Sequence, residues 1–334
     1  MSVNTAKFMI RKNIIVIIFA LVPICGLHLS VLSAKDTFHI TSDETAKINK
    51  SKGTLILKKN VVIIQQSSQS TIKTDNLFVQ RDTTSDQVVK AIADGNVEIQ
   101  YQPLVKKSEH RDQQHNQINK EPNTLKAVNS TCKWAAFDRQ SGLIEMRGSV
   151  LVKSVDYLIE ADHIKYYYNA ENGRMTALPG EQVTMTFFRQ VSGKGSGTLS
   201  SFDRYKTRAS ADLVLINRAG RKITFQGKVD IFDSKDQSQM NAHRAELFFD
   251  DNEDLERMIA NGKFIMTQPK RVSKADRAVF EYRSEEVTLI GNAYVKEEDQ
   301  IEISSSLIKM HIEAEKGIIS GADKVPVKMK VKIE

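Results

Sequence analysis

Hydrophobic and polar residues alternate along most of the chain after residue 34, in short runs that break at glycines. The clearest example, Ser141 to Tyr168, reads SGLIEMRGSVLVKSVDYLIEADHIKYYY. Alternation with a period of two puts apolar side chains on one face of a β-strand and polar ones on the other. The pattern therefore predicts antiparallel strands with a single apolar face, which must fold over on one another or meet a second sheet.

The alternating pattern recurs four times. Each copy is an alternating strand, a break, a second strand, a polar turn and a third strand, and the copies begin at Gly53, Gly142, Arg221 and Glu285. A fourth strand closes each copy behind a small residue or glycine, from Ala91, Thr176, Met258 and Ile318. Repetition of this kind predicts stacked antiparallel meanders of about sixty residues each.

Glycines mark the breaks and strand starts of these repeats, at Gly95, Gly148, Gly180, Gly227, Gly262, Gly291 and Gly321. Two roles fit them: a bulge with positive φ that bends the strand around a corner, or an ordinary turn. Helical periodicity is weak everywhere. The best candidate, DDNEDLERMIANG from Asp250, is predicted to be a hairpin loop with at most one helical turn.

The first 34 residues form a leader of a different kind. Lys7, Arg11 and Lys12 precede a long apolar run that ends in Leu32-Ser33-Ala34, as in an export signal. The run is also long enough for a retained membrane anchor, so a cleaved signal peptide and an inner-membrane anchor are both considered, with cleavage favoured. Lipid attachment at Cys25 is not expected, because Ile24 precedes it.

Two segments interrupt the repeats. A polar insert and a Gly/Ser-rich linker divide the chain into the predicted regions 1–34 (leader), 35–103 (first repeat), 104–125 (insert), 126–190 (second repeat), 191–207 (linker) and 208–334 (C-terminal repeats). One long folded sheet, two tandem domains and a fusion of two related parts all fit this division.

Composition is that of a globular protein, with 40% hydrophobic and 27% charged residues among 334. Removing the basic leader lowers the formal net charge from +7 to +4, which suits anionic partners such as phosphorylated lipids. For an exported chain nucleic acid is not an expected partner. Only Cys25 and Cys132 occur, so the body after the leader cannot form an internal disulfide.

No motif for catalysis, metal binding or cofactor binding emerges. The histidines lack metal-ligand spacing, and His163 and His243, which occupy similar places in two repeats, are interpreted as surface residues. GKGSG from Gly193 lacks the spacing of a phosphate loop, and DDNED from Asp250 lacks that of a calcium loop. The prediction is a non-enzymatic protein without cofactor, whose regular apolar face is the functional surface.

The repeat resembles the OstA/LptA family of lipopolysaccharide-transport proteins. The matching order is G-x-I-x-M-x-G-x-V-x-V, then I-E-A-D-x-x-x-Y, then V-x-M, between Gly142 and Phe187. Weaker copies run from Thr45 to Tyr101 and from Ala209 to Val331. The chain is about twice as long as the familiar single-domain member and has an insert and a linker that this member lacks.

This resemblance implies an all-β antiparallel β-jellyroll, a folded-over sheet open along one side, whose interior holds the acyl chains of lipopolysaccharide. It implies a periplasmic location, end-to-end self-association, and LptC-like inner-membrane and LptD-like outer-membrane partners, together bridging the two membranes for outer-membrane assembly. The membrane-anchored adaptor of the same route and an exported β-repeat scaffold are the alternatives. The long run of membrane-barrel strands expected of the outer-membrane partner is missing.

Strand parity selects the residues expected to line the lipid-binding groove. They are Val61, Ile63, Val97, Ile99, Met146, Val150, Val152, Ile164, Tyr166, Met185, Phe187, Phe225, Val229, Ile231, Phe264 and Met266. Met and Phe at these positions suit a groove for variable apolar ligands. A closed dry core would use the same residues.

Overall fold

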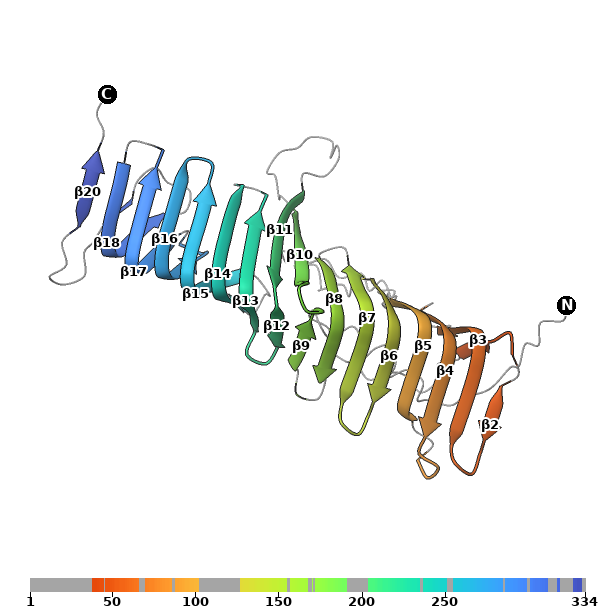
Figure 1. Ribbon diagram of the computed structural model, residues 1–334. Helices are drawn as coiled ribbons and strands as arrows, with labels where there is room; N and C mark the ends of the chain where they lie inside the picture. The colour runs from red at the N-terminus through yellow and green to blue at the C-terminus, as the bar shows by residue number, and fades with distance from the viewer. Residues whose placement is uncertain are drawn as a thin grey trace, which may run out of the picture. The chain divides into compact units, whose positions relative to one another are not determined.

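The computed structural model consists of β-strands joined by turns (Figure 1). It describes residues 38–44, 46–65, 70–85, 88–101, 127–154, 157–167, 170, 172–190, 204–234, 237–250, 255–284, 286–298, 301–311, 317–318 and 327–331. Within these ranges there is no helix, and so none that could cross a membrane. The all-β antiparallel fold class is confirmed. The predicted leader and polar insert lie outside the described residues.

The strands belong to two compact units, one up to Val155 and one from Asp156. The division between them falls inside the predicted second repeat, residues 126–190. The N-terminal unit comprises β1 (Phe38–Thr41), β2 (Lys47–Asn49), β3 (Thr54–Gln65), β4 (Thr71–Arg81), β5 (Val88–Tyr101), β6 (Val128–Asp138) and β7 (Leu143–Ser154). Strands β3 to β7 form an antiparallel meander, and β1 and β2 both pair along the free side of β3.

The C-terminal unit begins with a set of split strands. They are β8 (Tyr157–Tyr167), β9 (Asn172–Thr176), β10 (Val183–Gln190), β11 (Arg204–Ala211) and β12 (Leu213–Asn217). Both β9 and β10 pair with the single long strand β8, and β11 and β12 both pair with the next long strand. Residues 177–182 and Asp212 thus interrupt two neighbouring strands. The predicted linker 191–207 overlaps β11, which starts at Arg204.

A regular meander follows in the same unit. Its strands are β13 (Lys222–Asp233), β14 (Ser238–Phe249), β15 (Leu255–Gln268), β16 (Arg271–Glu281), β17 (Glu286–Glu297) and β18 (Ile301–His311), with β19 (Gly317–Ile318) and β20 (Lys328–Val331) both pairing with β18. Figure 1 shows these strands side by side. Residues Leu255 to Arg257, expected to belong to a loop, lie at the start of β15, ahead of the strand predicted from Met258, and they pair with β14 and β16.

Five of the seven glycine breaks, Gly95, Gly148, Gly227, Gly262 and Gly291, are bulges inside continuous strands. Gly180 instead lies between β9 and β10, and Gly321 lies outside the described residues. At Gly95 and Gly291, with φ of 79° and 73°, the register shifts and the next residue is also left-handed. A Cβ at Gly291 would lie 2.5 Å from Asp276 Oδ2 on the neighbouring strand, so the close approach needs glycine. The expectation that these glycines bend the strands is confirmed at these two positions.

A small buried residue followed by a polar one faces each glycine bulge from the neighbouring strand. Thr74-Asp75 does so in β4, where Thr74 Oγ1 lies 3.0, 3.1 and 3.2 Å from the carbonyl oxygens of Asn76, Asp94 and Gly95. Ala275-Asp276 does the same in β16. The Ala-Asp pairs of the sequence therefore mark the corners of the fold.

Contacts between residues far apart along the strands show that the C-terminal unit folds over at these corners. Phe280 pairs with Met258, six residues before Phe264 on β15, which would separate the two phenylalanines by about 16–20 Å in a flat sheet. Their ring centroids instead lie 5.9 Å apart, edge to face. The two halves of each strand therefore face each other across a shared interior.

Candidate functional site: the apolar interior

The interior of each unit is lined by the apolar faces of its bent strands. All the predicted groove residues except Phe187 are buried. In the N-terminal unit these are Val61, Ile63, Val97, Ile99, Met146, Val150 and Val152, and in the C-terminal unit Ile164, Tyr166, Met185, Phe225, Val229, Ile231, Phe264 and Met266. The structure thus brings together within each unit side chains that are distant in sequence.

Phe187 differs from the rest of the predicted set, because it is only half-buried. It lies on β10 where that strand pairs with Tyr157 at the beginning of β8 and with Thr207 of β11. Its side chain has the predicted inward parity, since Met185 and Val183, two and four residues earlier, are buried. Proximity to the strand end, which parity cannot report, leaves the ring partly open to solvent.

Several interior residues escaped the sequence prediction. Phe137, Met175, Met258 and Phe280 are each 3% exposed or less. Met258 lies before the corner of β15, where the buried positions keep the same parity through Phe264 and Met266. Phe137 and Phe280 lie beyond a corner at which the buried parity changes: in β16 the buried residues are Ser273 and Ala275 before the corner, then Ala278 and Phe280 after it. The available signal was the Ala-Asp pair, which marks this change of phase.

The interior of the N-terminal unit contains a small hollow. A hollow of about 20 Å³ is lined by Ala91 and Ile99, which are eight residues apart on β5 and thus on opposite sides of the fold. Its other lining residues are Ile72, Leu77, Ala93, Ala135, Ala136, Phe137 and Ile144. Ligand pockets typically enclose about 300–1,000 Å³, so this hollow is too small for a drug-sized ligand.

One side chain joins two strand ends that a flat sheet would hold far apart in the C-terminal unit. Arg271 at the beginning of β16 pairs with Glu297, whereas Met310 of β18 pairs with Val287, ten residues earlier on β17. A flat sheet would place these ends about 30 Å apart. Arg271 Nη1 nevertheless lies 3.8 Å from Met310 Sδ, and Arg271 Nη2 lies 3.0 Å from Glu297 Oε1. Arg271 therefore connects the two halves of the folded sheet.

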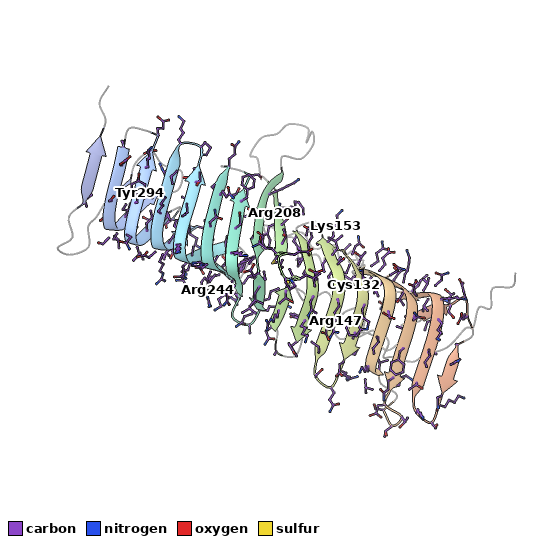
Figure 2. The ribbon with its side chains drawn as sticks, in the orientation of Figure 1. Cys132, Arg147, Lys153, Arg208, Arg244 and Tyr294 are labelled. Atoms are coloured by element: carbon purple, nitrogen blue, oxygen red, sulfur yellow. The ribbon has the colours of Figure 1, made fainter. Side chains whose placement is uncertain are left out.

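The outer faces carry charged side chains, including Lys153, Arg208 and Arg244 (Figure 2). Glu246 Oε1 lies 3.0 Å from Arg244 Nη2 and 3.1 Å from Lys222 Nζ. Burial alone would raise the pKa of Glu246, but hydrogen bonds from Arg244 and Lys222 outweigh it, and the pKa lies below its ordinary value. These groups stabilise the outer face of β13 and β14.

Candidate chemical groups are dispersed through the described residues. Burial raises the pKa of Cys132 to about 11, so the thiol stays protonated at neutral pH. His243 is exposed at a corner and His163 is half-buried on β8. Among the described residues, no group of three or more His, Cys, Asp or Glu side chains is placed to hold a metal ion.

Fold and interior together define an all-β protein whose antiparallel strands bend at glycine corners and enclose an apolar interior. Residues 209–316 match the family described as LptA/(LptD N-terminal domain) LPS transport protein. This segment takes in β12 to β18 completely. The resemblance seen in the sequence is confirmed for this part of the chain.

Among solved structures, that of LptH from Pseudomonas aeruginosa is similar. It is described as the LptA homologous periplasmic component of a conserved lipopolysaccharide transport device. The alignment has 11% sequence identity and a TM-score of 0.30, and it covers 43% of this chain and 85% of that chain. No curated protein sequence matches this chain.

Proposed function

We propose that this protein binds lipopolysaccharide in its apolar interior and carries it across the periplasm, as a non-catalytic component of a bridge between the inner and outer membranes. The family match of residues 209–316 supports the transport class. The single observation that carries the binding role is the folded sheet of the C-terminal unit, whose inward face is apolar from Ile164 in β8 to Val295 in β17.

Burial of acyl chains supplies the driving force in this proposal. Each methylene moved from water into an apolar interior contributes about 0.8 kcal/mol. The hollow between the halves of the N-terminal unit measures only about 20 Å³, so an acyl chain would enter it only if the halves separate there. In the C-terminal unit the Arg271 contact to Met310 connects the two halves that would separate.

The bridging role adds partners at the ends of the chain. Among the described strands, the short strands β19 and β20 each pair only with β18, β20 through Ile301 to Ser304 and β19 through Lys309 and Met310. Edge strands of this kind accept a further strand from another chain. End-to-end association with a second copy, and with LptC-like and LptD-like proteins, is part of the proposal.

Photocrosslinking in cells tests the binding role. A photoreactive residue at Val150 or Ile164, each 2% exposed, should form adducts with lipopolysaccharide. The same residue at the exposed Lys153, which lies on β7 near Val150, is the matched control. Adducts at the two inward sites and none at Lys153 support the proposal. An absence of adducts at every inward site contradicts it.

A structural scaffold is the second candidate, and the edge-to-face contact between Phe264 and Phe280 is the observation that favours it. A scaffold would keep the packing of Phe264 against Phe280 permanently closed. The same crosslinking experiment separates the two functions, because a closed scaffold forms no lipid adducts at Val150 or Ile164 while remaining folded by circular dichroism.

A further inference from the structure

At each corner bulge the second residue has a left-handed backbone: it is asparagine at three corners, serine at Ser149 and lysine at two. At three corners this residue is an asparagine whose Nδ2 donates a hydrogen bond to an aspartate on a neighbouring segment. The pairs are Asn60 to Asp43 at 2.6 Å, Asn96 to Asp75 at 2.9 Å and Asn292 to Asp276 at 2.9 Å. Asparagine tolerates the left-handed backbone there, so the corner is satisfied both in conformation and in hydrogen bonding.

Two adjacent corners of the C-terminal unit have lysine instead. Lys228 follows Gly227 in β13 with φ of 43°, and Lys263 follows Gly262 in β15 with φ of 50°. Lysine is uncommon in this conformation, and neither ammonium group forms a hydrogen bond or ion pair with any described residue. Residues held in an unfavourable backbone conformation tend to occur at functional sites, where the function of the side chain outweighs the conformational cost.

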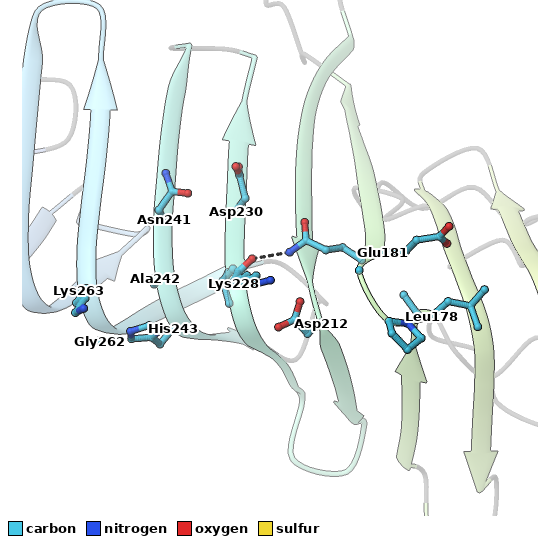
Figure 3. Close-up of a pocket in the computed structure, with 15 residues that line it drawn as sticks. Leu178, Glu181, Asp212, Lys228, Asp230, Asn241, Ala242, His243, Gly262 and Lys263 are labelled. Atoms are coloured by element: carbon cyan, nitrogen blue, oxygen red, sulfur yellow. Dashed lines mark hydrogen bonds between the residues drawn. The ribbon is translucent and has the colours of Figure 1, made fainter.

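Both lysines line one open cleft of about 820 Å³ (Figure 3). Between them, on β14, His243 occupies the corner position that is aspartate in Asp75 and Asp276. Three basic side chains from three adjacent strands therefore border the cleft. The floor includes Val229 and Ala242, and the polar lining also contains Asp212, Asp230 and Asn241.

The interruption of β9 and β10 provides the remaining wall. Residues 177–182 leave the sheet here, and hydrogen bonds hold them in place: Leu178 N donates to Asp162 Oδ2 at 2.8 Å, and Gln182 Nε2 donates to the carbonyl oxygen of Lys228 at 2.8 Å. Ser210 Oγ also donates to Gln182 Oε1 at 3.2 Å. The wall is thus fixed before any ligand arrives, which lowers the entropic cost of binding.

The mixed lining restricts the class of ligand. Lysine and histidine side chains donate to phosphate oxygens through charge-assisted hydrogen bonds. The carboxylates of Glu181, Asp212 and Asp230 repel a bare anion but accept hydrogen bonds from hydroxyl groups, as Asn241 also can. A ligand that carries both a phosphate and several hydroxyls satisfies the two sets together.

We infer that this cleft is a binding site for a phosphorylated saccharide, with Lys228, His243 and Lys263 directed to the phosphate and Asp212 and Asn241 to sugar hydroxyls. The site lies at the corner and does not use the apolar interior. It therefore goes beyond the proposed lipid-binding function, and its sugar could be free in solution or the headgroup of a glycolipid.

The test uses the full chain and glucose 6-phosphate as the probe, with binding measured by isothermal titration calorimetry. In the double variant K228N/K263N, asparagine suits the left-handed backbone better than lysine, so the thermal unfolding midpoint should not fall. The variant K133N/K153N removes two exposed lysines of the N-terminal unit and is the charge-matched control.

Wild type and control should bind glucose 6-phosphate saturably and more tightly than glucose or inorganic phosphate. The cleft variant should lose at least about tenfold in affinity, as expected for the loss of charge-assisted hydrogen bonds. Competition by purified lipopolysaccharide would show that a lipid-borne sugar reaches the cleft, and lack of competition would assign it to a free sugar. No saturable binding, or equal affinity in K228N/K263N, would overturn the inference.

This outcome is separable from that of the proposed function. Adducts at Val150 and Ile164 report on the interior, whereas glucose 6-phosphate affinity reports on the corner cleft. Loss of one signal with retention of the other identifies which of the two proposals is wrong.

Discussion

Replacing Phe264 by alanine measures whether the interior is packed in the free protein. Phe264 is 1% exposed, and its ring meets Phe280 edge to face with centroids 5.9 Å apart. Truncating a phenylalanine in a packed core destabilises a protein by about 3–5 kcal/mol. Because total stabilities are about 5–15 kcal/mol, F264A should remove a large part of the stability of the C-terminal unit.

Phe232 is the matched control, since it is also a phenylalanine on a strand of the same unit but is 41% exposed. F232A should change the free energy of unfolding by only about 0.5 kcal/mol. Urea unfolding followed by far-UV circular dichroism and by hydrogen exchange of β13 to β17 gives both values. Trp134 is the only tryptophan and lies in the N-terminal unit, which carries neither substitution. Its fluorescence therefore reports separately on the unfolding of that unit.

A loss below about 1 kcal/mol in F264A would refute the reasoning. It would mean that the ring is solvated in the free protein and that the interior is an open groove before lipid arrives. A loss near the expected value instead establishes that lipid must displace a packed contact. In that case lipopolysaccharide should narrow the stability difference between F264A and wild type, because acyl chains fill the space left by the ring.

Three further outcomes are expected. Gly291→Ala should destabilise the protein more than Gly180→Ala. Both glycines have positive φ, but only a Cβ at Gly291 would meet another atom, Asp276 Oδ2 at 2.5 Å. Chemical denaturation measures both free energies of unfolding, and equal losses would argue against the corner contact. Because the pKa of Glu246 is lowered, its carboxylate stabilises the fold above the ordinary pKa of 4.5, and this contribution is lost as the pH falls through the folded-state pKa. E246Q should therefore be less stable than wild type at pH 7, and the difference should vanish toward pH 3. A difference in stability that does not change with pH would contradict this prediction. The thiol of Cys132, with its pKa raised to about 11 by burial, should react with iodoacetamide at pH 8 far more slowly in the folded chain than in urea, and equal rates would show that β6 opens readily.

Sequence alone identified the strands, because a period of two is a local property that each strand carries within itself. Alternation around Val97 and Ile99 in β5, or around Val150 and Val152 in β7, reports the inward face without reference to any partner strand. The glycines at 95 and 291 were likewise recognisable, since few other residues suit a bulge with positive φ. The family resemblance rested on the same alternation and glycines.

Tertiary structure decided what lies across each corner. Whether a glycine break separates two strands or bends one depends on the neighbouring strand, which supplies Asp75 at Gly95 and Asp276 at Gly291. Contacts between Phe264 and Phe280, and between Arg271 and Met310, join residues that a flat sheet would hold far apart. The cleft at Lys228 and Lys263 requires two interrupted strands and three adjacent corners together. The periodicity of a single strand cannot predict such contacts, because they form only when the sheet has folded over and brought distant segments together.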